Sequence, residues 1–306
     1  MHLRCEYDTI IASNCMETEI NMEHTTSKKI DIVKSDAAVK YIDQIDYSDA
    51  EPWLFDEVYE NGEGLYAICL ADTVIGFSYI EDEPQGFLYV YIFPAYRNKG
   101  YGNMAVTAME QQIKASPLIR ILTTYRSDCK AAIRLAEKHG YVKKYVSALM
   151  EYRGDKFPEQ ELPIRHYRDE DYPEAFAIYA EAFHVMRLGT GCFPDSVIAQ
   201  PNEKERKYWA EHADDGYVYL SGDEIVGHAR IDGSELDVVS VKISHQGKGF
   251  GRAFVQFLVN RILEKGEGVP TLWCVVGNNK ARTLYDSLGF LEIYSSVFAS
   301  KRFGDR

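Results

Sequence analysis

The sequence predicts two α/β (α+β) domains of the same kind in one chain of 306 residues. The chain is long for a single domain. Apolar, strand-like segments alternate with segments of helical periodicity, and they occur in the same order in both halves. The repeat distance, taken between Gly100 and Gly249, is 149 residues. Because solenoid repeats run to about 50 residues, this distance indicates duplicated whole domains.

The second half opens with a short strand and an acidic helix start, "IRHYRDEDYPEA". Asp169 or Asp171 is a candidate cap for this helix, and Pro173 suits its first turn. We expect a polar, loop-rich stretch at 187–215, with Trp209 packed inward. The elements that follow are a hairpin (216–231), a strand buried on both faces (235–243), a glycine-rich stretch (245–251), a helix, a buried strand (271–276), a short helix ended by Gly289 and a final strand (291–303).

The first half repeats this order with a strand at 29–33, a helix at 35–45, a hairpin at 64–80, a strand at 86–93, a glycine stretch at 96–102, a strand at 119–125 and a helix from 130. "RGDKFPEQELP" contains two prolines and predicts a linker. We therefore expect an N-terminal extension (1–27), a first domain (28–154), a linker (155–163) and a second domain (164–306).

Composition excludes several classes of protein. Hydrophobic residues make up 46% and the net charge is −13, spread over both halves, which argues against nucleic acid and mildly favours cationic small molecules. The six cysteines form no C-x-x-C pair, so we expect no metal site and no disulfide framework. Neither a signal peptide nor an apolar run long enough for a membrane span is present. We expect a cytoplasmic protein, and an oligomer is compatible with the sequence.

The two glycine stretches share the pattern [RQ]-x-x-G-x-G, with Arg97, Gly100 and Gly102 in "YRNKGYG" and the corresponding residues in "HQGKGFG". Each follows an apolar strand and begins a helix, where free backbone N–H groups and the helix dipole favour phosphate. A plain glycine turn is the alternative for one copy, and two equivalent copies favour a phosphate-bearing ligand. A Walker loop lacks its G-K-[ST], and a dinucleotide fingerprint has different glycine spacing.

These stretches, followed by a helix, a strand and "NNKARTLYDSLGF", resemble the GNAT superfamily of acyl-CoA-dependent N-acyltransferases. The resemblance covers nearly the whole second half and, more loosely, residues 28–152. It implies two GNAT-like domains, each a mixed, splayed β-sheet flanked by helices. It also implies acetyl-CoA as co-substrate and the amine of a small molecule or peptide as acceptor, with a slight preference for a cationic one.

The resemblance assigns roles to residues of the second half. The strand before the loop is expected to offer its backbone to the pantetheine and the thioester carbonyl, and the loop is expected to hold the diphosphate. Asn278 matches a residue that reaches the coenzyme arm; its alternative role is a helix N-cap. The expected coenzyme-binding residues are Val239, Ser240, Val241, Gln246, Gly247, Lys248, Gly249, Phe250, Gly251, Arg252 and Asn278, and in the first half Arg97, Asn98, Lys99, Gly100, Tyr101, Gly102 and Asn103.

Tyr285 matches the tyrosine whose hydroxyl can protonate the departing thiolate, although an aromatic residue of an amphipathic helix would look the same. The first half has Ala136 opposite Tyr285 and Cys129 opposite Asn278. We therefore expect catalysis in the second domain. Because both residues are absent from the first half, we expect the first domain to be non-catalytic.

The general base is left open among Glu235, Asp237, His228 and His245, or water alone. The segment 184–212 is expected to line the acceptor pocket. The alternative function is a non-catalytic module that binds CoA or acyl-CoA, and a longer acyl donor is also compatible with the sequence.

Overall fold

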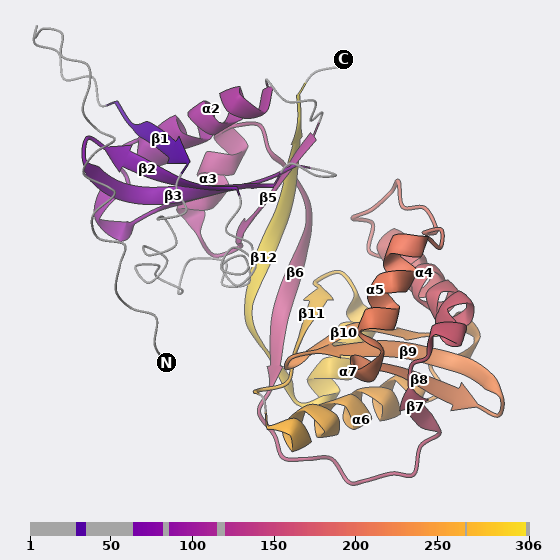
Figure 1. The fold of residues 1–306 in the computed structure, drawn as a ribbon. Coiled ribbons are helices and arrows are strands. Elements are labelled where there is room, and N and C mark those ends of the chain that lie inside the picture. The colour runs from indigo at the N-terminus through magenta and orange to yellow at the C-terminus, as the bar shows by residue number, and fades with distance from the viewer. Residues whose placement is uncertain (1–28, 35–63, 82–85, 115–119, 267, 304–306) are drawn as a thin grey trace, which may run out of the picture. The chain divides into compact units, whose positions relative to one another are not determined.

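The computed structural model describes residues 29–34, 64–81, 86–114, 120–266 and 268–303. The expected extension at 1–27 and the predicted helix at 35–45 lie outside these residues. Packing divides the chain into two compact units, which Figure 1 labels by element. Unit 1 holds the described residues up to Thr123 together with Arg302 and Phe303, and unit 2 runs from Thr124 to Lys301.

Unit 1 is a sheet with one described helix against it. Its strands lie in the order β1 (Asp31–Lys34), β2 (Leu65–Leu70), β3 (Thr73–Glu81), β4 (Phe87–Ile92) and the start of β5 (Arg120–Arg126). Neighbours are antiparallel except β4 and β5. The predicted hairpin at 64–80 is confirmed. After the short η2 turn (Pro94–Tyr96), α2 (Tyr101–Lys114) packs its Tyr101 and Ala105 against Ile68, Ile75 and Ile92.

Unit 2 contains most of the described helices and strands. They are α3 (Lys130–Lys138), β6 (Val142–Tyr152), β7 (Ile164–His166), η3 (Asp169–Asp171), α4 (Tyr172–Gly189), α5 (Glu203–Glu211), η4 (Ala213–Asp215), β8 (Gly216–Ser221), β9 (Glu224–Asp232), β10 (Glu235–Val241), η5 (Ile243–His245), α6 (Phe250–Lys265), β11 (Thr271–Val275), α7 (Asn279–Leu288) and β12 (Phe290–Arg302). The predicted order of strands and helices is confirmed, including the end of α7 at Gly289, which has a φ of 97°.

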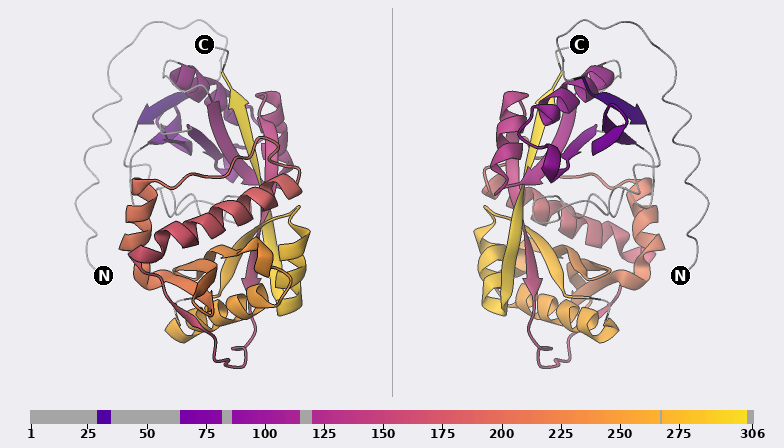
Figure 2. Two further views of the ribbon diagram at one scale, coloured as in Figure 1. Left: turned by 90° about the vertical axis from the view of Figure 1, so that its right-hand side faces the viewer. Right: turned by 90° about the vertical axis from the view of Figure 1, so that its left-hand side faces the viewer.

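The sheet of unit 2 has the strand order β12-β6-β11-β10-β9-β8-β7. Helices α6 and α7 cover one face, and α4 and α5 cover the other (Figures 1 and 2). The core on the α6 side contains Phe254, Leu258 and Phe290, and the core on the α4 side contains Phe176 and Trp209. Trp209 packs inward, as predicted.

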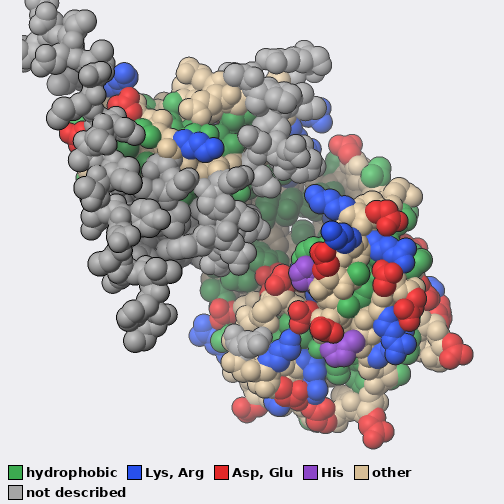
Figure 3. Space-filling view, in the orientation of Figure 1, with side chains coloured by type: hydrophobic (Ala, Val, Ile, Leu, Met, Phe, Trp, Pro, Cys, Tyr) green, Lys and Arg blue, Asp and Glu red, His purple; other side chains and the backbone are tan. Residues whose placement is uncertain are grey.

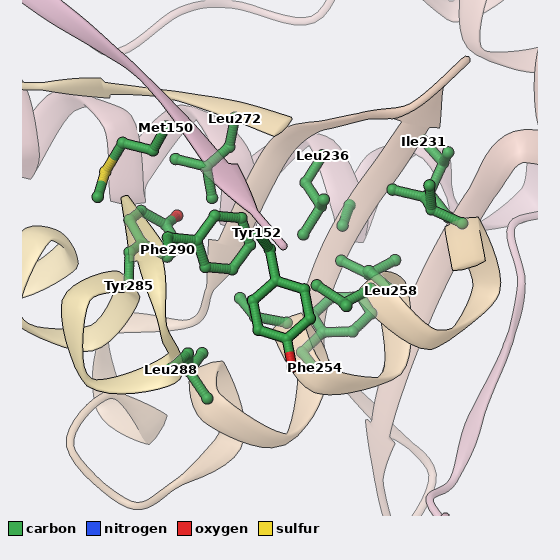
Figure 4. Packing of buried hydrophobic residues seen from close by; sticks show 14 of the residues in the cluster. Met150, Tyr152, Ile231, Leu236, Phe254, Leu258, Leu272, Tyr285, Leu288 and Phe290 are labelled. Carbon is green, nitrogen blue, oxygen red and sulfur yellow. The ribbon is translucent and has the colours of Figure 1, made fainter. Parts of the chain in front are cut away.

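Strand β6 comes from the first sequence repeat but lies inside the sheet of the second. It is antiparallel to β11 on one side and to β12 on the other. Its Ala148, Met150 and Tyr152 are buried in the same core as Leu272 of β11 and Phe290 of β12 (Figure 4). Strands β11 and β12 are therefore not neighbours in the sheet. Each is hydrogen-bonded to β6, which precedes both in the sequence by more than a hundred residues.

Met150→Ala is expected to destabilise the protein by about 2–5 kcal/mol, because Met150 is fully buried and the truncation leaves a cavity. Leu149 points to the opposite, half-buried face of β6 and is the matched control, so Leu149→Ala is expected to have the smaller effect. Denaturant unfolding measures both changes. Equal, small losses would show that β6 is not part of this core.

The stretch 187–215 is loop-rich as expected, since residues 190–202 form neither helix nor strand, but it also contains the end of α4 at Gly189 and the unexpected helix α5. Helix α5 is capped by Asn202, whose side chain accepts from Glu205 N. The expected helix cap is corrected. Neither Asp169 nor Asp171 caps α4 through its side chain, although Pro173 lies in its first turn. Their carboxylates are taken by other partners: Asp169 pairs with Arg206, and Asp171 with Arg165 and the Arg168 amide.

The expected burial of β10 and β11 on both faces is also wrong. Both strands alternate between buried and partly exposed residues over much of their length. Their partly exposed residues leave the face opposite α6 less completely covered, and the cavity described below lies on that face.

The predicted linker at 155–163 packs against α6. The buried Asn260 side chain accepts from Phe157 N at 2.8 Å and donates to Phe157 O at 3.0 Å. Phe157 also packs on Tyr152, with ring centroids 5.0 Å apart. The boundaries at 28–154, 155–163 and 164–306 follow the sequence repeat and stay a proposal, whereas packing groups α3 and β6 with the second repeat.

Candidate active site

Strands β10 and β11 separate soon after they begin. Their parallel pairing is limited to Glu235 and Thr271, so the remaining length of the two strands exchanges no ladder hydrogen bonds. Beyond this pair, the backbone N–H and C=O groups on the edges that face the opening take part in no β10–β11 ladder, so a ligand can use them. The glycine loop lies at the far end of β10, so the opening leads to it.

A β-bulge interrupts β10 beside this opening. The register with β9 shifts between Asp237 and Ser240, and Val238 has a φ of 45°. This left-handed conformation is unfavourable for a β-branched residue, and such strain concentrates at functional sites. Asp237 Oδ1 accepts from Val238 N at 2.8 Å, and Ser240 Oγ donates to His228 O at 3.0 Å. The bulge removes the backbone around Val239 from the β9 ladder.

The glycine loop has the geometry of an anion-binding turn. Gly249 is the N-cap of α6 with a φ of 95°, and Gly247 has a φ of 73°. A Cβ added at either position would meet nothing within 4 Å, so the backbone there is open to a ligand. No side chain caps α6 and its first turn has no acidic residue, which leaves its N–H groups for an anion. These residues fit the diphosphate of coenzyme A.

The side chains of the loop hold it in place. Gln246 Nε2 donates to Val241 O at 3.0 Å, and Arg252 donates to Ser287 Oγ of α7. Phe250 packs edge-on to Tyr219, with centroids 5.2 Å apart. Lys248 is exposed, and a Cβ on Gly251 would contact Leu284, so this glycine sits at the α6–α7 contact.

The loop of unit 1 repeats this geometry. Arg97 Nε donates to Ile92 O at 2.7 Å, the counterpart of the Gln246 bond. Asn98 and Gly100 have φ values of 58° and 92° where the second loop has Gly247 and Gly249. Lys99 Nζ donates to Ala95 O at 2.8 Å. Tyr101, Gly102 and Asn103 form the first turn of α2.

The strand before the loop differs between the repeats. Strand β4 pairs with β3 from Phe87 to Ile92 without any register shift, so it lacks the bulge of β10. Its Tyr89 and Tyr91 are buried where β10 has Val238 and Ser240. The two repeats therefore share the loop but not the strand geometry beside the opening.

Tyr285 lies on α7 with 9% of its surface exposed. Its ring packs against Phe290, with centroids 5.7 Å apart (Figure 4). Burial, and then the nearby Cys274 thiol, raise the pKa of the Tyr285 phenol above its usual value, so the hydroxyl keeps its proton. The phenol is therefore protonated at neutral pH, as a proton donor to a thiolate must be.

Asn278 is the N-cap of α7, and its side chain accepts from Ala281 N at 3.4 Å, so the helix-capping alternative is confirmed. In the first repeat, Cys129 precedes α3 without a side-chain cap, and Ala136 is buried. The structure thus places the aligned pairs at equivalent helix positions.

The four candidate bases have different surroundings. Burial, and then repulsion by Asp237 and Asp232, raise the pKa of Glu235 to about 7. Burial lowers the pKa of His228 to about 3, too low for a base that works near neutral pH. Asp237 is paired with Arg230 at 2.8 Å. His245 packs edge-on against Phe250. Glu235 is the best suited of the four.

A cavity of about 180 Å³ lies beside the bulge, on the face covered by α4 and α5. Asp237 and Val238 of the bulge line it, together with Glu205, Tyr208 and Trp209. These three fall within the segment 184–212 that was expected to line the acceptor pocket. Strand β9 and the bulge also contribute residues to the cavity wall, and no local sequence pattern predicts this contribution.

Comparison with known proteins agrees with this architecture. The "Acetyltransferase (GNAT) family" matches residues 31–141, and "FR47-like protein" matches residues 223–299. A mycothiol acetyltransferase of Renibacterium salmoninarum is 26% identical over 72% of this chain and 69% of its own length. One of Amycolatopsis mediterranei is 25% identical over 76% of this chain and 82% of its own length.

Solved structures show the same fold. A GCN5-related N-acetyltransferase from Sphaerobacter thermophilus superposes with a TM-score of 0.69 at 18% identity, covering 90% of this chain and 97% of that one. A tandem GNAT protein from the clavulanic acid biosynthesis pathway gives 0.61 at 11% identity, covering 91% and 100%.

The chain belongs to the GNAT superfamily and carries two GNAT-like regions. It is an acetyl-CoA-dependent N-acetyltransferase. No helix among the described residues is both long and apolar enough to cross a membrane.

Proposed function

We propose that the second repeat carries out the acetyl transfer, from acetyl-CoA to a primary amine of a small molecule. The observation that supports this best is the coincidence of two features in one repeat. Only the second repeat combines the bulged strand at Val238 with a tyrosine at position 285, whereas the first has the unshifted β4 and Ala136. The coenzyme-type loop and a parallel strand pairing limited to one residue pair are common to both.

In this proposal the thioester lies in the opening between β10 and β11. The main chain around Val239, freed from the ladder by the bulge, hydrogen-bonds the carbonyl oxygen and polarises it. The amine nitrogen bonds to the carbonyl carbon, the carbon–sulfur bond breaks, and the Tyr285 hydroxyl gives its proton to the sulfur. The amides of Gly247 and Gly249 hold the diphosphate and so fix the position of the carbonyl.

The amine must lose a proton before it attacks, and we propose Glu235 as the acceptor of that proton. Val239 lies four positions after Glu235, about 13 Å along an extended strand. The proton therefore passes through water. A pKa of about 7 suits a general base at neutral pH, because roughly half of the carboxyl groups are then ionised.

Glu235→Gln is expected to lower kcat/KM about tenfold near pH 7.5. In the unmodified protein the rate should rise with pH until the raised carboxyl pKa near 7 is passed, since only the ionised carboxylate accepts a proton. The variant should lose this inflection. Asp223→Asn is the control, because Asp223 is exposed in the turn between β8 and β9 and is not among the charges that raise the pKa of Glu235. An unchanged pH profile in Glu235→Gln would exclude this role.

The relatives named mycothiol acetyltransferase support a small-molecule acceptor rather than a macromolecule.

The first repeat, in this proposal, keeps the fold without turnover, and its loop at 97–103 is a second place where a coenzyme could dock. The alternative, a module that only binds acyl-CoA, predicts no thiol release with any amine. Thiol release from acetyl-CoA with a panel of amines therefore separates the two.

A further inference from the structure

The cavity beside the β10 bulge is separate from the glycine loop and from Tyr285. It lies between α5, the middle of α4 and the strands β8 to β10. Because Val238 of the bulge forms part of its wall, a molecule in the cavity is next to the strand segment that we assign to the thioester. A role for this cavity in acceptor binding rests on the proposed function of the second repeat.

Aromatic rings form much of the wall. Trp209 lies at the centre, with Tyr179 edge-on at 6.0 Å and Tyr167 edge-on at 5.9 Å between ring centroids. One face of the indole stacks on His228 at 4.3 Å. Aromatic faces attract cations through their quadrupole. The wall already shows this preference, since the Arg230 guanidinium lies 5.1 Å from the centre of the Tyr208 ring.

Two carboxylates converge on the cavity from different elements. Glu205 comes from α5 and Asp237 from β10. Burial raises the pKa of Tyr179; Arg187 opposes this through its charge and a hydrogen bond to the hydroxyl, and the charges of Glu205 and Asp237 add to the rise. A single hydroxyl therefore lies within the field of both carboxylates.

The charge balance around the cavity is negative. Arg230 is shared by Asp232 and Asp237 at 3.0 and 2.8 Å, and so does not neutralise both. Arg187 and the partly ionised Glu235 complete the set of charged groups near Tyr179 and β10. Over the face of unit 2 in Figure 3, acidic and basic side chains are interspersed.

Two buried polar atoms at the cavity have no hydrogen-bond partner within the described part of the chain: Tyr167 Oη and His228 Nδ1. Buried polar groups normally have a hydrogen-bond partner, so two such atoms without one, in residues that line a cavity, indicate a bound ligand or water. His228 is neutral because burial lowers its pKa to about 3, and so it adds no positive charge.

The corresponding place in the first repeat is filled. His228 pairs with Ser240 across β9 and β10, and Phe77 pairs with Tyr91 across β3 and β4. Phe77 and Tyr91 stack at 5.5 Å, and Phe93 packs edge-on to both. Among the described residues, the first repeat thus has three packed aromatic rings where the second has His228 and Ser240.

We propose that this cavity binds the acceptor as an ammonium ion, held by the ring faces of Tyr179 and Trp209 and by the carboxylates of Glu205 and Asp237. The acceptor is therefore a small cationic amine. Its uncharged part packs against Tyr167 and His228, which also line the cavity. Neutral isosteres and anions of the same shape bind weakly.

Three probes of one shape test this at pH 7: 2-phenylethylamine, 2-phenylethanol and 3-phenylpropanoate, with binding to the full chain followed by tryptophan fluorescence. The amine is expected to bind about fivefold or more tightly than the alcohol, and the carboxylate weakest. Equal binding of amine and alcohol, or preferred binding of the carboxylate, would overturn the proposal.

Glu205→Gln keeps the contact with Asn202, the cap of α5, but removes the charge. It should therefore cancel most of the difference in affinity between the amine and the alcohol. Glu203→Gln, two residues earlier on the exposed side of α5, is the matched control and should keep it. Tyr179→Leu removes a π-face and should weaken the amine selectively. If Glu205→Gln keeps full discrimination, the assignment fails.

Acetyl-CoA affinity and thiol release are measured on the same samples. Charge-selective amine binding without any turnover would support the cation site and contradict the proposed function. Turnover of amines without charge-selective binding would support the proposed function and contradict the cation site.

Discussion

Tyr285→Phe is expected to lower kcat by about a hundredfold, at the lower end of the effect of a positioned proton donor. The substitution removes one oxygen and keeps the ring against Phe290, so the core packing stays intact. The affinity for acetyl-CoA is expected to change little. Steady-state kinetics together with equilibrium binding of acetyl-CoA measure the two quantities separately.

Tyr217→Phe is the matched control. Tyr217 belongs to the same buried cluster, where it packs edge-on to Phe257 of α6, but it lies on β8, away from the opening. Loss of the Tyr217 hydroxyl is expected to leave kcat within about twofold of that of the unmodified protein. If Tyr285→Phe behaves like Tyr217→Phe, the proton donor must be sought elsewhere and the chemistry need not lie in the second repeat.

Gly249→Ala is expected to weaken acetyl-CoA binding by about thirtyfold or more, the effect of losing one hydrogen bond to a charged group. The φ of 95° is strained for alanine, and the new methyl group would point into the open space at the loop. The expected signature is a raised Kd and KM for acetyl-CoA with a smaller change in kcat.

Gly266→Ala separates strain from ligand contact. Gly266 has a φ of 70°, also with nothing within 4 Å of an added Cβ, and it lies at the opposite end of the same helix. It should lose similar stability without losing acetyl-CoA affinity. Gly100→Ala, at the first loop, is expected to leave turnover intact. Loss of turnover in Gly100→Ala, with the fold preserved, would assign a necessary role to the first repeat.

The sequence could predict the order of elements because strand and helix periodicities are local properties. Gly249 was recognisable because its neighbours supply a strand, a turn and a helix in succession, and the φ of 95° shows why a glycine stands there. Tyr285 could be found only through the motif around it, since a buried aromatic residue on a helix has no distinctive pattern of its own.

Other features depend on contacts between distant residues. The hydrophobic pattern of β6 is the same whether its partners are the strands of the first or the second repeat, so its place between β11 and β12 has no local signal. The bulge is hidden for a similar reason. Val238 favours regular strand by propensity, and its φ of 45° occurs beside the contacts of Asp237 with the distant Arg230 and with the Val238 amide.

The helix α5 was missed because its sequence, "EKERKYWAE", is polar apart from Trp209 and Tyr208 and shows little apolar periodicity. Its burial comes from one large aromatic residue rather than from an apolar stripe. The cavity then forms where this helix, β9 and the bulge meet, and its residues extend from Tyr167 to Val238 in the sequence.

A crystal structure of the full chain with acetyl-CoA tests the central claim most directly. We predict the diphosphate on the main-chain N–H groups at 247–251 and the thioester in the opening between β10 and β11, with its sulfur nearest Tyr285 of all the ionisable groups. Acetyl-CoA bound at the loop of the first repeat alone, or with its thioester remote from Tyr285, would contradict this claim.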